Sequence, residues 1–152
     1  MACTGVWHGG PMATESTHRS LTVERVKAGR FAAVNSRGGR IMFGMGEDEE
    51  FTPTELLLIA IGGCTAIDVD LLTSRRSEPD SFEIVVDADK VRDEGGNHLA
   101  NVEVTYRISF PAGEDGDKAR SVLSEAVRQS HERLCTVGRT VELPTPITTR
   151  IG

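Results

Sequence analysis

Residues 52–74 read TPTELLLIAIGGCTAIDVDLLTS, and this stretch predicts a helix that begins at Pro53 and ends near Ser74. Thr52 is a favourable N-cap residue, and proline is favoured at the first helical position. Glu55 stands three residues after Thr52, which is the spacing of a capping box. The start of the helix is therefore specified by three consecutive signals.

The predicted helix is apolar on nearly every side as far as Ile67. Such a helix is buried on most sides, so we expect it to be the central helix of the fold. Gly62 and Gly63 each cost about 1 kcal/mol relative to alanine in a helix interior, which points to a close approach by another backbone or by a ligand. Both glycines directly precede Cys64.

The regions on either side of this helix have strand patterns. Between residues 21 and 43, apolar and polar residues alternate and two glycine turns divide them into three short antiparallel strands. Residues 44–51 form an acidic loop. After the helix, residues 82–86 and 102–110 alternate strictly around a turn near residues 93–97, which predicts a long hairpin.

The remainder of the chain predicts a second helix and a last strand. Residues 118–134 have an amphipathic helical pattern, and residues 140–151 fit an edge strand that contains prolines. The order is βββ-α-ββ-α-β, an α+β layout. We expect one domain over residues 20–152 and a flexible tail over residues 1–19. The inward positions of the second helix are Ala119, Val122, Leu123, Ala126, Val127, Ser130 and Leu134.

The composition excludes several classes of protein. A chain of 152 residues with 38% apolar and 26% charged residues suits one globular domain. Three cysteines without a C-x-x-C pair indicate neither a disulfide scaffold nor a zinc ribbon, so we expect a reducing cytoplasm. No signal peptide is expected, and Asp68 and Asp70 interrupt the apolar run, which argues against a membrane span. A net charge of -6 argues against a nucleic-acid partner.

Cys64 and Cys135 are the candidate reactive residues, whereas Cys3 falls in the predicted tail. Cys64 ends an apolar helical run, and Cys135 follows the polar stretch RQSHERL at residues 128–134. If the fold brings the two cysteines together, they form a dithiol. Two buried structural cysteines are the alternative, because burial is the usual fate of a free cysteine.

Several of these motifs together resemble the OsmC/Ohr family of organic hydroperoxide reductases and their relatives. They are Thr52-Pro53 with Glu55-Leu56-Leu57, Gly62-Gly63-Cys64, and the segment SHERLCTV at residues 130–137. The resemblance covers about residues 21–151. It implies an OsmC-like fold that forms an intertwined homodimer, with two central helices packed on antiparallel sheets and active sites at the subunit interface.

The resemblance also implies the chemistry. Members of this family are thiol peroxidases, so Cys64 is expected to be the peroxidatic residue and Cys135 the resolving one. A thiolate attacks the O–O bond of a peroxide, and a second cysteine then condenses with the sulfenic acid. The resemblance implies organic hydroperoxide substrates, a role in oxidative stress defence, no cofactor, and an external dithiol reductant such as a lipoyl group.

The same resemblance places an arginine beside the peroxidatic cysteine. The context Asn35-Ser36-Arg37 favours Arg37, and Arg40 is the alternative, because the acidic loop is longer here. Glu55 is the candidate carboxylate that orients this arginine.

The sequence departs from the family pattern at two positions of the site. Thr54 occupies the position of that carboxylate, with Glu55 one place later, and Thr136 replaces the proline that follows the resolving cysteine. The capping box explains Glu55 without catalysis.

His131 and Cys135 are four residues apart, a spacing that can bind zinc. A zinc site would also need Cys64 and a fourth ligand. The only further cysteine or histidine in the folded part is His98, so we expect no metal site. We expect His131 instead to act at the C-terminus of the second helix. The leading hypothesis is thus a cytoplasmic thiol peroxidase. The second is a non-catalytic OsmC-like dimer that responds to redox state or binds a small ligand.

Overall fold

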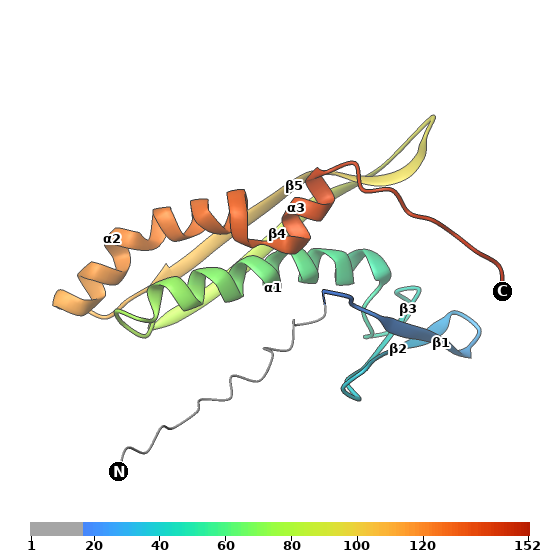
Figure 1. Cartoon of the computed structure of the whole chain (residues 1–152), viewed down its shortest axis with the longest axis horizontal. Helices are drawn as coiled ribbons and strands as arrows, with labels where there is room; N and C mark the ends of the chain where they lie inside the picture. The colour runs from blue at the N-terminus through green and yellow to red at the C-terminus, as the bar shows by residue number, and fades with distance from the viewer. Residues whose placement is uncertain (1–16) are drawn as a thin grey trace, which may run out of the picture. The chain divides into compact units, whose positions relative to one another are not determined.

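The computed structural model describes residues 17–152 and divides the chain into two compact units, which are residues up to 50 and residues 51–152 (Figure 1). The order of elements in the described residues confirms the predicted α+β class, with three strands, a helix, two strands and a helix in succession. The predicted single domain over residues 20–152 stays a prediction. Residues 1–16, including Cys3 and most of the predicted tail, lie outside the described residues.

The first unit contains a three-stranded antiparallel sheet, as predicted. Its strands are β1 (Leu21–Lys27), β2 (Arg30–Asn35) and β3 (Arg40–Gly44), and β2 lies in the middle. Phe31 pairs with Phe43 across β2 and β3, and their rings stack with centroids 5.9 Å apart.

The second unit contains a long hairpin of β4 (Ser81–Asp93) and β5 (Gly96–Ser109). The predicted turn lies at residues 93–96, where Gly96 has a φ of 111° that favours glycine. Apolar residues face each other across the two strands, because Phe82 pairs with Ile108, Ile84 with Tyr106, and Val86 with Val104. This register gives the hairpin one continuous apolar face.

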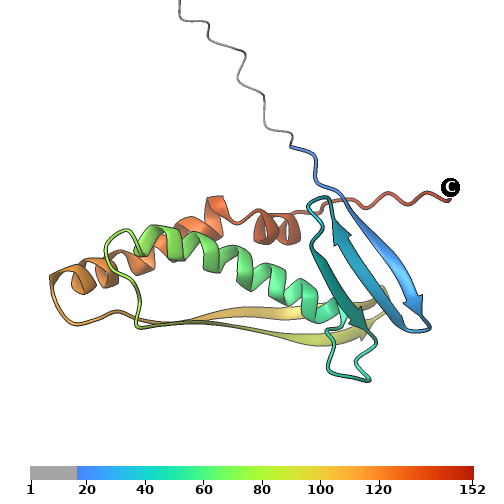
Figure 2. The same ribbon diagram turned by 90° about the horizontal axis from the view of Figure 1, so that it is seen from below.

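Helix α1 (Pro53–Thr73) begins as predicted. The Glu55 side chain accepts a hydrogen bond from the Thr52 N–H at 2.7 Å, and the Glu55 N–H donates to Thr52 Oγ1 at 3.3 Å, which completes the capping box. Figure 2 shows α1 and the second helix, α2 (Glu114–Gln129), on the same side of the hairpin. α1 approaches β4 closely at Gly62, where an added Cβ would stand 2.6 Å from Val86 Cγ2.

The burial of α1 differs from the prediction. Within one copy of the chain, its buried residues lie along one side of the helix, whereas we expected burial on most sides. These residues are Ile61, Gly62, Thr65, Val69 and Thr73. Four large apolar residues elsewhere on the helix are exposed, with exposed fractions between 41% and 64%. α1 is also long and apolar enough, by length and composition, to cross a membrane, a property shared by core helices of soluble proteins. The exposed apolar residues are Leu57, Ile59, Ile67 and Leu71.

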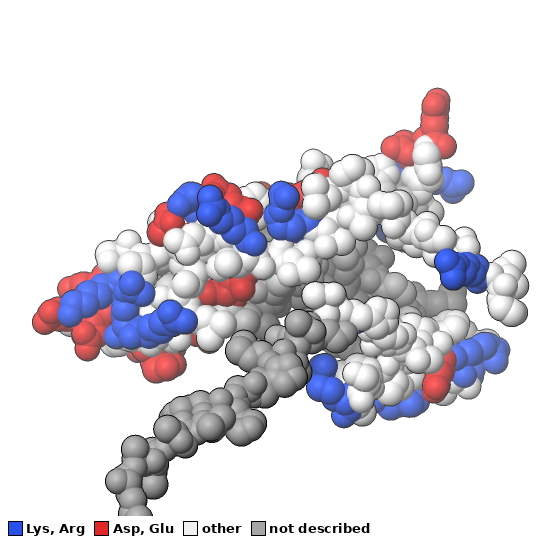
Figure 3. Space-filling model, in the orientation of Figure 1, with Lys and Arg blue, Asp and Glu red and all other residues white. Residues whose placement is uncertain are grey.

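The second helix is interrupted where the sequence predicts a regular continuation. α2 (Glu114–Gln129) is followed by a π-helical turn, η1 (Ser130–Leu134), and by the short helix α3 (Thr136–Glu142). The wider turn changes which residues face inward, so Ser130 is buried as predicted but Leu134 is 47% exposed. Acidic and basic side chains intermix along the outer side of α2 (Figure 3).

The predicted last strand over residues 140–151 is not formed. Residues up to Glu142 belong to α3, and residues 143–152 have no regular structure and are exposed. Pro144 and Pro146 have no N–H groups to donate to a sheet. Within the described residues, one sheet contains β1, β2 and β3, the other contains β4 and β5, and neither includes this segment. The alternating pattern of this segment therefore has no partner strand in the described chain.

Candidate functional site

The second unit brings Cys64 and Cys135 together, as the sequence predicted. Cys64 lies in the middle of α1 and is half-buried, whereas Cys135 follows η1 and is buried, with 4% of its surface exposed. Both are free thiols, and the Cys64 side chain is within hydrogen-bonding reach of Cys135. The two cysteines therefore form an adjacent dithiol contributed by two different helical segments.

The surroundings of Cys135 disfavour its thiolate. Burial is the largest cause that raises the pKa of the Cys135 thiol, and the adjacent Cys64 and the negative charge of Asp68 raise it further. A hydrogen bond from the Gly138 N–H to Cys135 Sγ, at 3.2 Å, opposes these effects. Together these surroundings favour the thiol of Cys135 over its thiolate.

A chain of polar side chains lies beside the two cysteines. Ser130 Oγ is 2.8 Å from Thr65 Oγ1 and 2.8 Å from Asp68 Oδ2, and Thr65 Oγ1 is 2.6 Å from the Tyr106 hydroxyl. Ser130 and Thr65 are buried, with 0% and 5% of their surfaces exposed. The chain joins η1 to α1 and to β5.

The sequence reasoning did not identify this polar chain. The inward position of Ser130 was predicted from helical periodicity, and Thr65 directly follows Cys64, so both residues carried a local signal. The contact between them joins positions 65 residues apart and depends on how η1 docks on α1. No pattern within either segment specifies that contact.

Two cavities flank α1 in the second unit. A cavity of about 260 Å³ lies next to Cys135, between the helical segments and β5, and is lined by valines together with Thr65, Tyr106 and His131. A more open and mostly apolar pocket of about 540 Å³ lies between α1 and β4. The larger pocket is lined by Phe51, Glu55, Leu58, Ile59, Gly62, Gly63, Ala66, Phe82, Ile84 and Val86.

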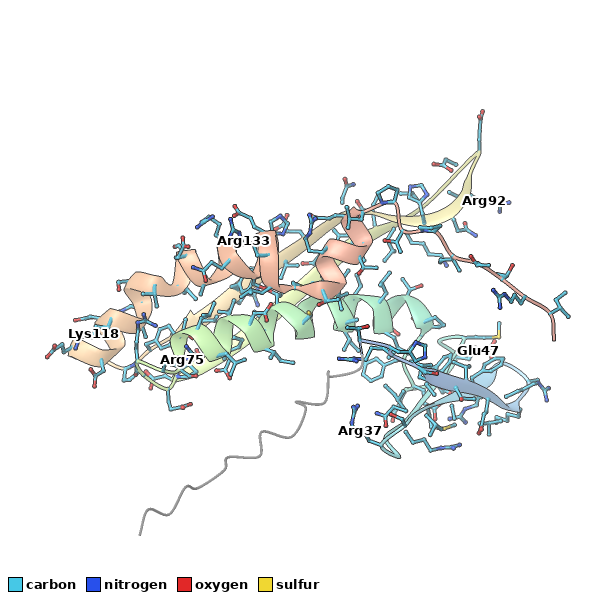
Figure 4. The ribbon with its side chains drawn as sticks, in the orientation of Figure 1. Arg37, Glu47, Arg75, Arg92, Lys118 and Arg133 are labelled. Atoms are coloured by element: carbon cyan, nitrogen blue, oxygen red, sulfur yellow. The ribbon has the colours of Figure 1, made fainter. Side chains whose placement is uncertain are left out.

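The two candidate arginines belong to the first unit. Arg37 lies in the turn between β2 and β3 (Figure 4), and Arg40 is the first residue of β3. The Asn35 side chain accepts hydrogen bonds from the N–H groups of Arg37 and Gly39, both at 2.9 Å, so Asn35 shapes this turn. Both arginine residues are exposed, and within residues 17–152 neither forms a salt bridge.

The carboxylate of Glu55 takes part in the capping box. Hydrogen bonds from the Thr52 backbone and side chain lower the pKa of Glu55, and the Thr52 hydroxyl lies 2.9 Å from Glu55 Oε2. Glu55 also lines the larger pocket. The structural role that the sequence predicts for Glu55 is therefore formed.

His131 lies in the last turn of the helical segment formed by α2 and η1, at the end where the sequence placed it. Its Nε2 lies 3.6 Å from the Glu142 carboxylate on α3, and its ring lines the cavity next to Cys135. In the part of the chain that the structure describes, no group of three metal-ligating side chains is formed.

Comparison with known proteins places this arrangement in a family. The sequence profile described as OsmC-like protein matches residues 46–150, which is more than half of the chain. The chain belongs to the OsmC-like protein family. An uncharacterized protein of Mycobacterium tuberculosis (strain H37Rv) is 29% identical over 128 residues, covering 84% of this chain and 91% of the relative.

Solved structures of OsmC-like proteins share the fold. A hypothetical protein from Aquifex aeolicus has a TM-score of 0.67 at 24% identity, over 84% of this chain and 89% of that one. An OsmC-like protein of unknown function from Vibrio cholerae has a TM-score of 0.67 at 13% identity, over 84% and 95%. The organic hydroperoxide resistance protein OhrB of Bacillus subtilis has a TM-score of 0.52 at 16% identity, over 82% and 90%.

Proposed function

We propose that this OsmC-like protein is a thiol-dependent peroxidase that reduces organic hydroperoxides, with Cys64 as the peroxidatic residue and Cys135 as the resolving residue. The observation that carries the proposal is the adjacency of the two thiols in the second unit. Family membership supports it, because solved relatives include organic hydroperoxide resistance proteins.

In the first step, the Cys64 thiolate attacks the terminal oxygen of the hydroperoxide. A bond forms between sulfur and oxygen, the O–O bond breaks, and the alkoxide leaves and takes a proton to become an alcohol. Cys64 is oxidised to a sulfenic acid. The assignment of this role is supported by exposure, because Cys64 is half-buried whereas Cys135 is buried and holds its proton.

In the second step, the Cys135 sulfur attacks the sulfur of the sulfenic acid. A disulfide forms, and the hydroxyl group of the sulfenic acid leaves with the proton of Cys135 as water. An external dithiol, such as a lipoyl group, then reduces the disulfide by exchange and becomes a disulfide itself. No cofactor enters this cycle.

An arginine is proposed to stabilise the Cys64 thiolate. Arg37 is the first choice and Arg40 the alternative, and Glu55 is proposed to orient the guanidinium. Support for Glu55 is weaker than for the cysteines, since its carboxylate already accepts the hydrogen bonds of the capping box. A catalytic Glu55 would have to serve the helix start and the arginine together.

The exposed apolar side of α1 supports a homodimer. Four large apolar residues of this helix are exposed within the chain, and exposed apolar surface marks protein interfaces. We propose that a second copy of the chain covers it in the intertwined arrangement of the family, so that the hydroperoxide binds at the subunit interface. The organic group of the substrate would lie against apolar side chains. We further propose a cytoplasmic location and a role in oxidative stress defence.

A second candidate function is a non-catalytic dimer that responds to redox state or binds a small ligand. The formed capping box favours it, because Glu55 is engaged without any arginine. The pocket of about 540 Å³ beside α1 would accept an apolar ligand. Both functions require the same fold, so only reactivity separates them.

The test uses cumene hydroperoxide and variants in a Cys3→Ser background, so that only the two site cysteines react. Cys64→Ser should abolish peroxide consumption. Cys135→Ser should consume one equivalent and leave a sulfenic acid that dimedone traps. Arg37→Met should slow the first step more than Arg40→Met. Peroxide consumption that survives Cys64→Ser would exclude the proposed mechanism. A wild-type protein that consumes no peroxide would leave the binding function.

A further inference from the structure

The π-helical turn η1 stands between α2 and Cys135, and Ser130 is its first residue. The Cys135 N–H donates to the Ser130 carbonyl at 2.9 Å, five residues back, which is the hydrogen bond of a π-turn. In a regular α-helix two residues five positions apart differ by roughly 140° around the axis. The wider turn lets both Ser130 and Cys135 be buried, with exposed fractions of 0% and 4%.

The side chain of Ser130 fixes this turn to the helix that carries Cys64. It contacts Thr65, the residue directly after Cys64, and Asp68, one helical turn further on, each at 2.8 Å. Ser130 therefore holds Cys135 through its carbonyl and α1 through its hydroxyl. The path from Cys64 to Cys135 through these contacts runs through two residues, Thr65 and Ser130.

The Ser130 hydroxyl is a donor in this group of polar side chains and has two acceptors within reach. It can donate its one proton to Thr65 Oγ1 or to Asp68 Oδ2, each at 2.8 Å, and the Thr65 and Tyr106 hydroxyls share a hydrogen bond of 2.6 Å. Each of these four polar side chains has a hydrogen-bond partner. Within the described residues, no buried side-chain nitrogen or oxygen is unpaired.

We propose that Ser130 is a positioning residue that holds Cys135 against Cys64, with Thr65 and Asp68 as its anchors on α1. It acts on the second step of the proposed function, the closure of the disulfide, and the inference rests on the proposed pairing of the two cysteines. A disulfide tolerates only a narrow range of separations, so a loosened η1 makes closure less favourable. Hydrogen bonds to a charged group are among the stronger ones in proteins, which makes the Asp68 contact an effective anchor.

The experiment measures the equilibrium between the dithiol and the disulfide in buffers of reduced and oxidised glutathione. Oxidised glutathione accepts the two electrons, so the measurement needs no peroxide and stands apart from peroxidase activity. In the Cys3→Ser background, Ser130→Ala should lower the equilibrium constant for disulfide formation about tenfold. Thr65→Val should lower this equilibrium constant by a smaller factor. Thr65→Ser keeps the hydroxyl and should therefore keep the equilibrium constant of the parent protein.

Two control variants separate positioning from stability. Val69→Ala removes a fully buried side chain from the same helix, so it should lower the melting temperature without changing the disulfide equilibrium. Ser124→Ala, on the exposed side of α2, should change neither. If Ser130→Ala does not fold, the Thr65→Val and Thr65→Ser pair decides the question.

The proposal is overturned if Ser130→Ala keeps the wild-type equilibrium constant, if Thr65→Val and Thr65→Ser behave alike, or if the wild-type protein forms no disulfide in these buffers. A wild-type protein that forms the disulfide but does not consume hydroperoxide would refute the proposed function alone. The two failures are thus distinguishable.

Discussion

The environments of Cys64 and Cys135 differ in ways that divide the chemistry between them. Cys135 is buried, and burial together with the nearby Cys64 and the charge of Asp68 raises the pKa of its thiol. Cys64 lies half-buried in the middle of α1, where a substrate has better access. A resolving thiol that stays protonated does not compete for the peroxide, because the thiolate is the nucleophile.

This division predicts how Cys135 titrates. In a Cys3→Ser, Cys64→Ser background, the thiolate of Cys135 should appear above the pH at which an ordinary cysteine ionises, because burial and Asp68 both raise its pKa. Asp68→Asn removes a negative charge and should lower that midpoint. The ultraviolet absorbance of the thiolate measures the titration.

Asp70→Asn is the matched control, because Asp70 is an exposed aspartate on the same helix. It makes the same change of charge away from the cysteines and should leave the midpoint where it is. An unchanged midpoint in Asp68→Asn would show that the carboxylate does not act on Cys135.

At the residue scale, the sequence identified Cys64 and Cys135 as the candidate dithiol and predicted the capping role of Glu55, because each of these residues lies in a short motif. It did not predict the contacts of Ser130 with Thr65 and Asp68, which depend on the docking of two distant segments. The roles of Arg37 and Arg40 stay predictions.

Helix α1 shows at the element scale why two adjacent glycines are not equivalent. An added Cβ at Gly62 would overlap with Val86 of β4, whereas at Gly63 nothing lies within 4 Å. Gly62 therefore sets the approach of α1 to the hairpin, where the side chain of Val86 takes the place of the backbone or ligand that the sequence predicted. Gly63 faces the open pocket.

The two glycines should respond in opposite directions to alanine. Gly63→Ala should raise the free energy of unfolding by about 1 kcal/mol, since alanine is the better helix former. Gly62→Ala should lower it by about 1–3 kcal/mol, because the added methyl group overpacks the contact with β4. Urea denaturation measures both, and equal effects of the two substitutions would contradict the close approach at Gly62.

Among the elements, the sequence predicted those with their own periodicity and turn signals. These are the three N-terminal strands, α1 and the hairpin of β4 and β5. The last strand was predicted wrongly, because alternation alone does not supply a neighbouring strand. The π-turn was also missed, since residues 130–134 continue the helical pattern of α2 and the extra residue has no local signal.

At the scale of the whole molecule, the apolar surface of α1 is the feature that a single chain does not explain. Ile67 is 64% exposed and Leu71 is 55% exposed in the C-terminal half of this helix. Burial of such side chains contributes about 1.5–3 kcal/mol each, so a second copy that covers them would gain substantially. This is the physical basis of the proposed homodimer.

The dimer is tested by sedimentation over a range of protein concentrations. The wild-type chain should sediment as a dimer, and Ile67→Glu should shift the equilibrium towards monomer, because it would bury an unpaired charge. Ser124→Glu, on the exposed side of α2, is the control and should leave the dimer intact. A wild-type chain that remains monomeric at every concentration would contradict the proposed assembly.

The reaction of the reduced Cys3→Ser protein with an organic hydroperoxide tests the central claim most directly. In stopped-flow mixing with cumene hydroperoxide, the account predicts that two thiols are lost for each peroxide consumed, much faster than free cysteine reacts under the same conditions. Loss of thiols no faster than that of free cysteine would contradict the claim that Cys64 and Cys135 form a peroxide-reducing pair.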